Sequence, residues 1–197
     1  MRVGTKLVAV PMLAALLTPA AVLAEDGAGS GAAVASIERA TLLLPIRNAR
    51  IPLAGVLSGG QPTPEQIESA ARAGVRTVIN LRTDEEPGFE WERAAVEGHG
   101  MRYVHIPVAG ASGLTPRNVE RVDAALFGSL ELGPVLLHCA SGNRIGAVLA
   151  LREAWILDTD AESALQYGVR SGLRGLEPET RKLLGLSGSA AVRAKPR

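Results

Sequence analysis

The only cysteine of the chain, Cys139, stands five residues before Arg144 in the segment His138-Cys139-Ala140-Ser141-Gly142-Asn143-Arg144. A cysteine thiolate is a nucleophile, and the planar guanidinium of arginine can hold two oxygens of a phosphate or sulfate group. The residues before this segment predict a strand and those after it predict a helix. A strand that enters a tight turn and then a helix leaves several backbone N–H groups pointing into one concavity, which is an anion-binding nest. We therefore predict an oxyanion-binding thiolate site at this segment.

The turn at Gly142 supports the same chemistry. Glycine adopts backbone geometry that a side chain would resist, and the helix beginning near Arg144 adds the positive end of its dipole. This field favours the thiolate of Cys139, the nucleophilic form of its sulfur. The loop is thus expected both to activate the sulfur and to bind the group that it attacks.

Each part of the segment also has a plain structural interpretation. Cys139 could be a small buried apolar residue, Gly142 an ordinary turn and Arg144 a surface charge. With one cysteine in the chain, no disulfide can form within it. The order strand, cysteine, glycine, arginine and helix favours a functional site.

The remaining sequence predicts the elements that position this segment. Apolar runs predict strands at residues 56–58, 77–81, 102–108 and 135–138. Helical patterns predict helices at about residues 64–73, 89–96, 116–131 and 144–157, and two more starting near Asp160 and Glu177. Strands separated by helices indicate an α/β fold with a mainly parallel sheet of four to five strands, flanked by helices on both faces. Ligands of such sheets bind at the carboxyl ends of the strands, where Cys139 lies.

Four segments of the chain are typical of one protein family: Ser58-Gly59-Gly60-Gln61-Pro62, Val78-Ile79-Asn80-Leu81-Arg82, Tyr103-Val104-His105-Ile106-Pro107-Val108 and His138 to Gly146. Over about residues 53–173 the chain resembles the bacterial phosphatase-like branch of the cysteine phosphatase superfamily, close to the phosphatase-like domain called beta-lactamase hydrolase-like. The resemblance implies a cysteine phosphatase-like fold. It also implies that Cys139 attacks phosphorus to give a phosphocysteine and that Arg144 stabilises the transition state. The phosphate-binding backbone that it implies belongs to Ala140, Ser141, Gly142 and Asn143.

Two features depart from the standard pattern of the family. The standard tyrosine phosphatase loop has one residue more between cysteine and arginine than the four found here. The shorter loop is similar to that of rhodanese-like sulfurtransferases, in which the cysteine carries a persulfide. Ile145 replaces the hydroxyl residue that usually follows the arginine and assists departure of the thiolate. Breakdown of a phosphocysteine is therefore expected to be slow.

The loop after the third predicted strand lacks the aspartate that serves dual-specificity phosphatases as general acid. It reads Val108-Ala109-Gly110-Ala111-Ser112-Gly113-Leu114. A general acid typically contributes about 10² to 10⁴ in rate, so without one only activated esters turn over well. Asp84, Glu85 or Glu86 could supply the proton from a neighbouring strand end, or could form only a solvated acidic loop. Arg82 could enter the pocket or pair with these acids.

Three functions remain open from the sequence. The first is a hydrolase of the tyrosine or dual-specificity phosphatase kind, acting on a phosphorylated substrate of unknown class without metal or organic cofactor. The second is a sulfurtransferase using a Cys139 persulfide, and the third is a non-catalytic module that binds phosphate or sulfate. His99 and His105 have no acid or cysteine at ligand-like spacing, so no metal site is expected. The net charge of +1 offers no general attraction to nucleic acid or anionic membranes.

The two ends of the chain predict segments outside this domain. Arg2 and Lys6 precede an uncharged apolar run that ends in small residues, as in a secretory signal peptide cleaved after Ala24, although a retained anchor is the alternative. No later stretch is apolar for long enough to span a membrane. We expect a signal peptide at residues 1–24, a partly disordered leader at 25–50, one phosphatase-like domain at 51–186 and a disordered tail at 187–197. The protein is then exported, periplasmic or secreted, and the sequence predicts no oligomeric state.

Overall fold

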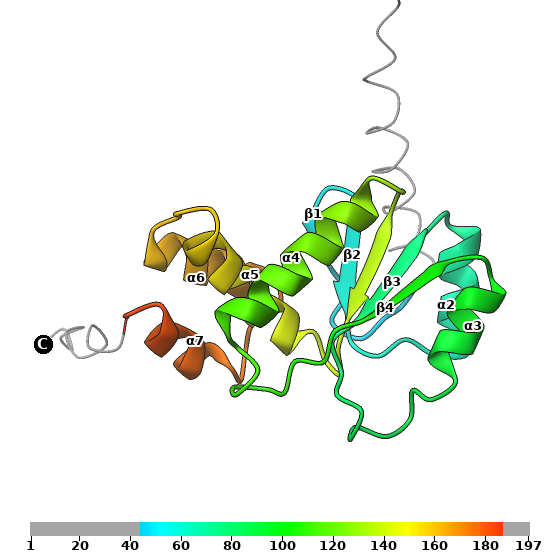
Figure 1. The fold of residues 1–197 in the computed structure, drawn as a ribbon, viewed down its shortest axis with the longest axis horizontal. Coiled ribbons are helices and arrows are strands. Elements are labelled where there is room, and N and C mark those ends of the chain that lie inside the picture. The colour runs from blue at the N-terminus through cyan, green and yellow to red at the C-terminus, as the bar shows by residue number, and fades with distance from the viewer. Residues whose placement is uncertain (1–43, 187–197) are drawn as a thin grey trace, which may run out of the picture.

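Five strands form one sheet in the order β1-β2-β5-β3-β4 (Figure 1). They are β1 Arg50–Leu53, β2 Val56–Gly59, β3 Thr77–Asn80, β4 Arg102–His105 and β5 Val135–His138. All neighbouring pairs are parallel except β1 and β2, which are antiparallel. This computed structural model describes residues 44–186, so the expected signal peptide, the tail and most of the leader lie outside the described residues. The predicted α/β fold with a mainly parallel sheet is confirmed.

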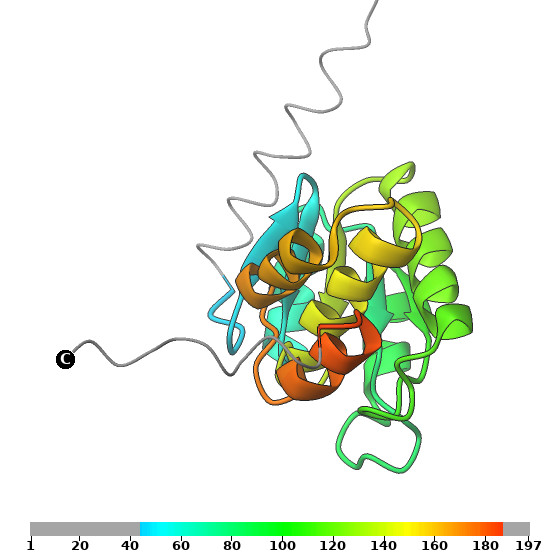
Figure 2. The same cartoon turned by 90° about the vertical axis from the view of Figure 1, so that its left-hand side faces the viewer.

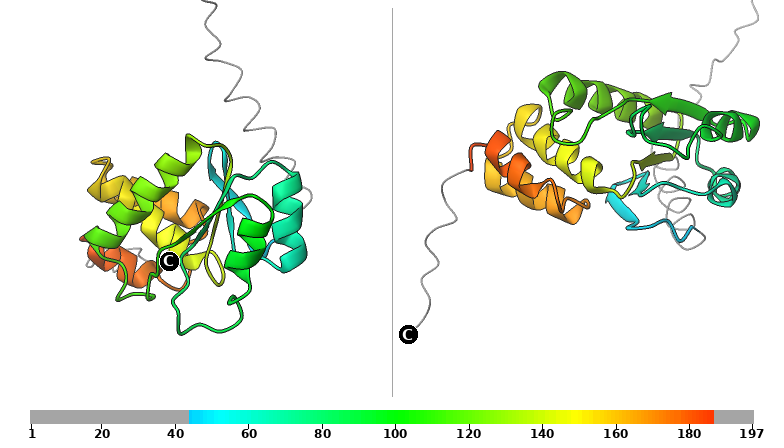
Figure 3. Two further views of the ribbon diagram at one scale, coloured as in Figure 1. Left: turned by 45° about the vertical axis from the view of Figure 1, so that its right-hand side comes forward. Right: turned by 90° about the horizontal axis from the view of Figure 1, so that it is seen from below.

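Helices cover both faces of the sheet. They are α2 Pro64–Arg72, α3 Glu92–Gly98, α4 Pro116–Leu130, α5 Asn143–Trp155, α6 Ala161–Arg170 and α7 Glu177–Leu183. Figure 3 separates α2 and α3 on one side of the sheet from α4, α5, α6 and α7 on the other. Within residues 44–186, no helix combines the length and the apolar character needed to cross a membrane.

The helices predicted from residues 64 and 116 begin at those residues, each after a threonine N-cap and with a proline in its first turn. Thr63 accepts a hydrogen bond from the backbone of Gln66 and donates its own N–H to that side chain, which completes a capping box at the start of α2. Thr115 caps α4 through the backbone N–H of Asn118.

The structure differs from the sequence predictions in several elements. The strand predicted at residues 102–108 ends at His105 as β4, before Pro107, which has no N–H to donate. The helix expected from residue 89 begins at Glu92, because the chain turns at Gly88 with a φ of +91° and Phe89 instead packs edge-on against His105. The strand β1 was not predicted, since it is short and contains Pro52, which suits an edge strand only. Leu44 and Ile46, placed by the sequence in the leader, are only 1% and 4% exposed, so the packed domain begins before residue 51.

The central strand β5 is buried on both faces. Val135 and Leu137 join the apolar core under α4 and α5, whereas Leu136 joins the separate core under α2 and α3. This alternation follows from the two-residue period of a strand. The end of β5, where Cys139 follows, is therefore held by packing on either side.

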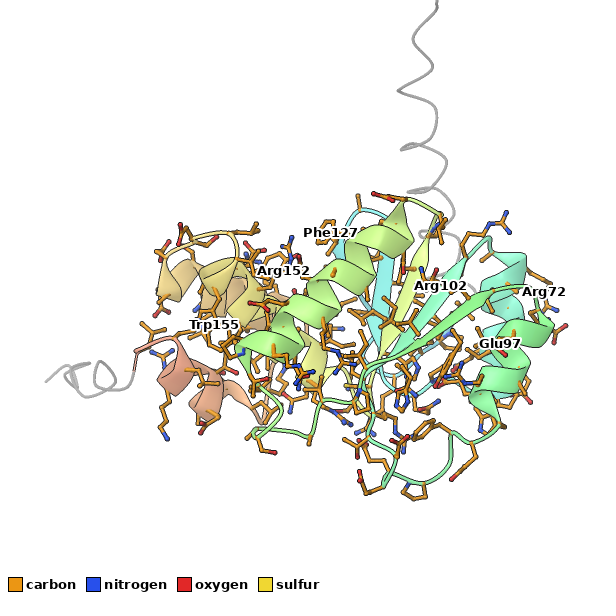
Figure 4. All side chains as sticks on the ribbon, in the orientation of Figure 1. Arg72, Glu97, Arg102, Phe127, Arg152 and Trp155 are labelled. Carbon is orange, nitrogen blue, oxygen red and sulfur yellow. The ribbon has the colours of Figure 1, made fainter. Side chains whose placement is uncertain are left out.

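The helix α5 is almost completely enclosed, with every residue from Ile145 to Leu151 buried. Figure 2 shows it behind α6 and α7 as seen from their side of the molecule. Towards α4, the guanidinium of Arg152 lies 4.5 Å from the ring centre of Phe127, in the region labelled in Figure 4. The helix that starts at the cysteine loop is thus fixed along most of its length.

Replacing Gly146 by alanine is expected to lower the free energy of unfolding by about 1 to 3 kcal/mol. A Cβ at this position would lie 2.1 Å from the backbone nitrogen of Leu173, which cannot move as a flexible side chain does. Gly128→Ala on α4 is the matched control, because no atom lies within 4 Å of its added Cβ, and it should be neutral or stabilising. Urea unfolding of both variants measures this, and equal midpoints would contradict the close packing of α5.

Candidate active site

Cys139 lies directly after β5 and is 1% exposed, so its sulfur sits at the bottom of the loop and not on the surface. The backbone N–H of Gly142 donates a hydrogen bond to the sulfur at 3.1 Å. Gly142 has a φ of +86°, the left-handed region for which glycine is suited, and it is the N-cap of α5. The loop thus directs an N–H group and the N-terminus of a helix at the sulfur.

The loop is braced from outside by its carbonyl oxygens. The oxygen of Ala140 accepts a hydrogen bond from the backbone of Gln61, and that of Ser141 accepts one from the side chain of Asn48 at 3.0 Å. Within residues 44–186, four N–H groups of the loop donate to no protein acceptor; they belong to Ala140, Ser141, Asn143 and Arg144. An anion in the concavity of the loop is the acceptor that such groups can serve.

The side chain of Asn143 has a separate structural role. Its oxygen accepts hydrogen bonds from the backbone of Arg174 at 2.8 Å and of Leu176 at 3.3 Å. Asn143 therefore ties the segment between α6 and α7 to the first turn of α5, while its own backbone N–H remains in the loop.

Arg144 presents one edge of its guanidinium to Glu86. Nη1 and Nη2 donate to the two carboxylate oxygens at 2.5 and 2.7 Å, and Nη1 also reaches the carbonyl oxygens of Leu81 and Val108 at 3.3 and 3.1 Å. This arrangement leaves Nε–H and the second hydrogen of Nη2 on the other edge, with the right geometry for two oxygens of one phosphate. Burial alone would lower the pKa of Arg144, but Glu86 and the charge of Cys139 together raise it. Arg144 is therefore always cationic.

The acidic loop after β3 sends one of its three acids to the site. The pKa of Glu86 is lowered to about 2, chiefly by the hydrogen bonds from Arg144. Asp84 lies 3.7 Å from Nδ1 of His105 with its side chain 80% exposed, and Glu85 is exposed. Arg82 also pairs with Glu86, at 3.3 Å, as one of the sequence alternatives predicts. At neutral pH Glu86 is an ionised partner of arginine.

Replacing Glu86 by glutamine is expected to flatten the acid dependence of stability. Because the folded-state pKa of Glu86 is below its ordinary value of 4.5, the carboxylate stabilises the fold above that pH, and this contribution is lost as the pH falls towards about 2. Denaturant unfolding between these limits should show a steeper loss of stability in the parent protein than in Glu86→Gln. Glu131→Gln, at an exposed position, should keep the parent slope. Identical slopes for the parent and Glu86→Gln would contradict the pairing.

A cavity of about 410 Å³ opens in front of the loop. Its wall comes from the loops after β3, β4 and β5 and from the segment before α7, through Thr83, Glu86, Ala109, Gly110, Ser141, Asn143, Arg144 and Leu176. Glu86 is the one carboxylic acid among these described lining residues. The loops after β3 and β4 extend beyond the end of the sheet in Figure 1, where the carboxyl ends of the parallel strands meet.

A buried carboxylate, Glu92, lies beneath the site and was missed by the sequence analysis. Its side chain is completely buried and accepts hydrogen bonds from Gln61 at 2.8 Å, from Asn80 at 2.8 Å and from Tyr103 at 3.0 Å. Nε2 of His138 lies 3.0 Å from the same carboxylate, although off the direction of a good hydrogen bond. Burial raises the pKa of Tyr103, so its hydroxyl stays a donor.

One residue from each of the four sequence motifs therefore meets at Glu92. Gln61, Asn80, Tyr103 and His138 come from the first, second, third and fourth motif respectively. The presence of one such polar residue in each motif was the sequence signal for a shared buried partner. Glu92 itself lies outside every motif. No cluster of three or more potential metal ligands occurs among the described residues.

A family model and several known proteins are similar to this chain. The family model of the "Beta-lactamase hydrolase-like protein, phosphatase-like domain" matches residues 53–156. Beta-lactamase hydrolase-like proteins of Xylella fastidiosa (strain Temecula1) and Agrobacterium fabrum (strain C58) are 38% and 32% identical over 98 and 99 residues. Each alignment covers 48% of this chain and 22% of the relative, so the matched part is about a fifth of the length of those relatives.

Solved structures share the fold. A DUF442 protein from Shewanella putrefaciens CN-32 has a TM-score of 0.58 and 24% identity, covering 76% of this chain and 96% of that one. P. aeruginosa TpbA and Tk-PTP each have a TM-score of 0.52 and 20% identity. The first alignment covers 66% of this chain and 78% of TpbA, and the second covers 69% of this chain and 95% of Tk-PTP.

Proposed function

Because the chain belongs to the family of the beta-lactamase hydrolase-like phosphatase-like domain, with its cysteine phosphatase-like fold, we propose that it hydrolyses phosphate monoesters through Cys139. The observation that carries this proposal is the contact between the Gly142 N–H and the Cys139 sulfur at the centre of a loop of unpartnered N–H groups. In this proposal a phosphate group bound in the loop accepts hydrogen bonds from these N–H groups and lies above the sulfur. The signal peptide expected at residues 1–24 supports a substrate outside the cytoplasm.

The first chemical step transfers the phosphoryl group to Cys139. The sulfur forms a bond to phosphorus, the ester P–O bond breaks, and the leaving oxygen takes a proton. The loop N–H groups and the free edge of Arg144 hold the phosphate oxygens as charge develops on them. Glu86 keeps Arg144 oriented through the opposite edge of the guanidinium.

The proton for the leaving group comes from solvent in this scheme. Glu86 is ionised and accepts two hydrogen bonds from Arg144, and it is the one carboxylic acid among the described residues that line the cavity. Esters with acidic leaving groups, such as aryl phosphates, are then the better substrates.

The second step hydrolyses the phosphocysteine and regenerates the free Cys139 sulfur. Water attacks phosphorus, the S–P bond breaks, and phosphate leaves. Ile145, completely buried, provides no hydroxyl to assist the departing sulfur, so the N–H of Gly142 is the donor that stabilises it. We expect this step to be slower than the first.

A burst experiment tests the proposed function. When p-nitrophenyl phosphate is mixed in excess with the protein, about one equivalent of nitrophenolate per protein should be released in a fast burst. Release should then continue at a slower steady-state rate. Acid quenching followed by peptide mass spectrometry should find the phosphoryl group on Cys139. Hydrolysis with no burst and no phosphocysteine would count against this order of rates, and phosphorylation elsewhere would sink the mechanism.

The length of the loop favours one second candidate, a sulfurtransferase. Four residues separate Cys139 and Arg144, as in the rhodanese-like loops that the chain resembles. The sulfane sulfur of thiosulfate would form a persulfide on Cys139 with release of sulfite, and cyanide would then accept it as thiocyanate. Thiocyanate formation that depends on Cys139, without phosphate release from any aryl phosphate, would select this candidate.

Replacing Glu86 distinguishes a residue that positions Arg144 from one that donates a proton to the leaving group. We expect Glu86→Gln to lower kcat/KM by about 10-fold, equally for p-nitrophenyl and phenyl phosphate, because it loosens Arg144 in both reactions. A general acid would instead make the loss grow with the pKa of the leaving group. Steady-state kinetics over a series of aryl phosphates measures this, with Glu131→Gln as a surface control.

A further inference from the structure

A second cavity shares a wall with the cavity in front of Cys139. It has a volume of about 250 Å³. Ser141 and Asn143 line both cavities. The rest of its wall comes from residues 47–50 and 172–175, which are far apart in the chain and lie side by side in Figure 2, the first cyan and the second orange. A group bound in the second cavity would therefore lie next to a phosphate held by the loop.

The second cavity carries concentrated positive charge. Three arginines line it, namely Arg47, Arg50 and Arg174, and no carboxylate does. Among residues 44–186 none of the three forms a salt bridge, whereas Arg82, Arg144 and Arg152 each pair with a carboxylate. Arg50 and Arg174 donate only to backbone carbonyl oxygens, and the guanidinium of Arg47 makes no hydrogen bond within the described residues. Like charges gathered without counter-ions destabilise a fold, and an anionic ligand offsets that repulsion.

Both walls of the second cavity are tied to the cysteine loop by hydrogen bonds. On one wall Asn48, with a φ of +56°, donates its amide to the carbonyl oxygen of Ser141, and Gly60 donates to the carbonyl oxygen of Arg47 at 2.8 Å. On the other wall the oxygen of Asn143 accepts the N–H of Arg174 at 2.8 Å. The spacing between the loop and the three arginines is therefore set by the fold.

We propose that the second cavity is a subsite for a second phosphate group on the substrate. This inference rests on the proposed function and names its substrate class, a compact phosphate monoester that carries another phosphate a few bonds away. The loop and Arg144 hold the phosphate that is cleaved, and the three arginines hold the one that is not. Guanidinium groups suit this task because each can bind two phosphate oxygens.

A series of small bisphosphates tests the subsite. The substrates are the ortho, meta and para benzenediol bisphosphates, compared with phenyl phosphate at constant ionic strength. After correction for the two equivalent phosphates, we expect kcat/KM for at least one bisphosphate to exceed that for phenyl phosphate by about 10- to 100-fold, the range of a few charge-assisted hydrogen bonds. The ratio should fall to near one in the double variant Arg47→Gln/Arg50→Gln.

Two further variants keep the test decisive. Arg174 lies on the wall of the second cavity opposite Arg47 and Arg50. Arg174→Gln should therefore lower the ratio of kcat/KM for the bisphosphate to that for phenyl phosphate, whatever the double variant does to folding. Arg72→Gln, an exposed arginine of α2 paired with Glu68, should leave the ratio unchanged. Circular dichroism and urea unfolding establish that each variant is folded.

Calorimetric binding of the same compounds to Cys139→Ser separates the two proposals. Tighter binding of a bisphosphate that depends on Arg47 and Arg50, without hydrolysis by the parent protein, would uphold the subsite and overturn the proposed function. Hydrolysis of phenyl phosphate without preference for any bisphosphate would do the reverse. A preference that survives all the arginine variants would also overturn the subsite.

Discussion

Replacing Cys139 by serine is expected to lower the hydrolysis of p-nitrophenyl phosphate by at least about 10³-fold, because the hydroxyl is a far weaker nucleophile at neutral pH than a thiolate. The substitution changes one atom at the bottom of the loop and keeps the backbone N–H groups that we propose to bind phosphate. Binding of inorganic phosphate, measured by calorimetry, should therefore persist. The combination of lost turnover and retained binding is what a nucleophile predicts.

The outcome that would contradict this prediction is equally clear. Phosphate release that continues in Cys139→Ser would assign the chemistry to another group or to a contaminating enzyme. Loss of both turnover and phosphate binding in a folded variant would mean that the sulfur organises the loop and does not act as a nucleophile. Urea unfolding of the variant guards against simple loss of structure.

Replacing Arg144 by lysine is expected to lower kcat/KM for p-nitrophenyl phosphate by about 10² to 10³-fold. Lysine keeps the positive charge but cannot bind Glu86 with one edge and two phosphate oxygens with the other. The pairing of Arg144 with Glu86 and its proposed binding of phosphate both depend on the planar fork. Most of the loss should fall on kcat, because the charge on the phosphate oxygens changes most in the transition state.

Arg152→Lys provides the matched control for this substitution. Arg152 lies on the same helix, pairs with Asp123, and is labelled on the α4 side of α5 in Figure 4, apart from the cysteine loop. We expect it to lower stability, because Arg152 also stacks on Phe127, but to change kcat/KM by less than about twofold. Equal losses in Arg144→Lys and Arg152→Lys would contradict a specific role for Arg144.

The parts of the molecule that the sequence predicts well are those set by neighbouring residues. The start of α2 at Pro64, the strand before Cys139 and the turn at Gly142 all follow from local preferences of side chain and backbone. The burial of β5 on both faces is likewise expected from its continuous apolar run. The fold class follows from the order of these elements along the chain.

The parts that the sequence does not predict depend on residues brought together from a distance. The sequence gives no reason to prefer one of the three carboxylates of the acidic loop. The fold brings Glu86 to the site by pairing it with Arg144, which is 58 positions away in the chain. The edge strand β1 has only four residues and contains Pro52, and it is held by pairing with β2 and by the hydroxyl of Tyr167, which donates to the carbonyl oxygen of Pro52. The cavity lined by Arg47 and Arg174 is equally invisible, since its walls meet only in the fold.

The meeting of four motifs at Glu92 has a consequence for engineering. A designer who transplants the cysteine loop into another scaffold carries His138 with it, but leaves behind the Glu92 carboxylate that lies 3.0 Å from this histidine and the three side chains that donate to that carboxylate. Such a graft would bury a histidine without the carboxylate that lies beside it in this protein. Substitutions at Gln61, Asn80 and Tyr103 should accordingly be strongly non-additive in double-mutant cycles, since they share one acceptor. The unit that can be moved between proteins is the loop together with this buried ring of side chains.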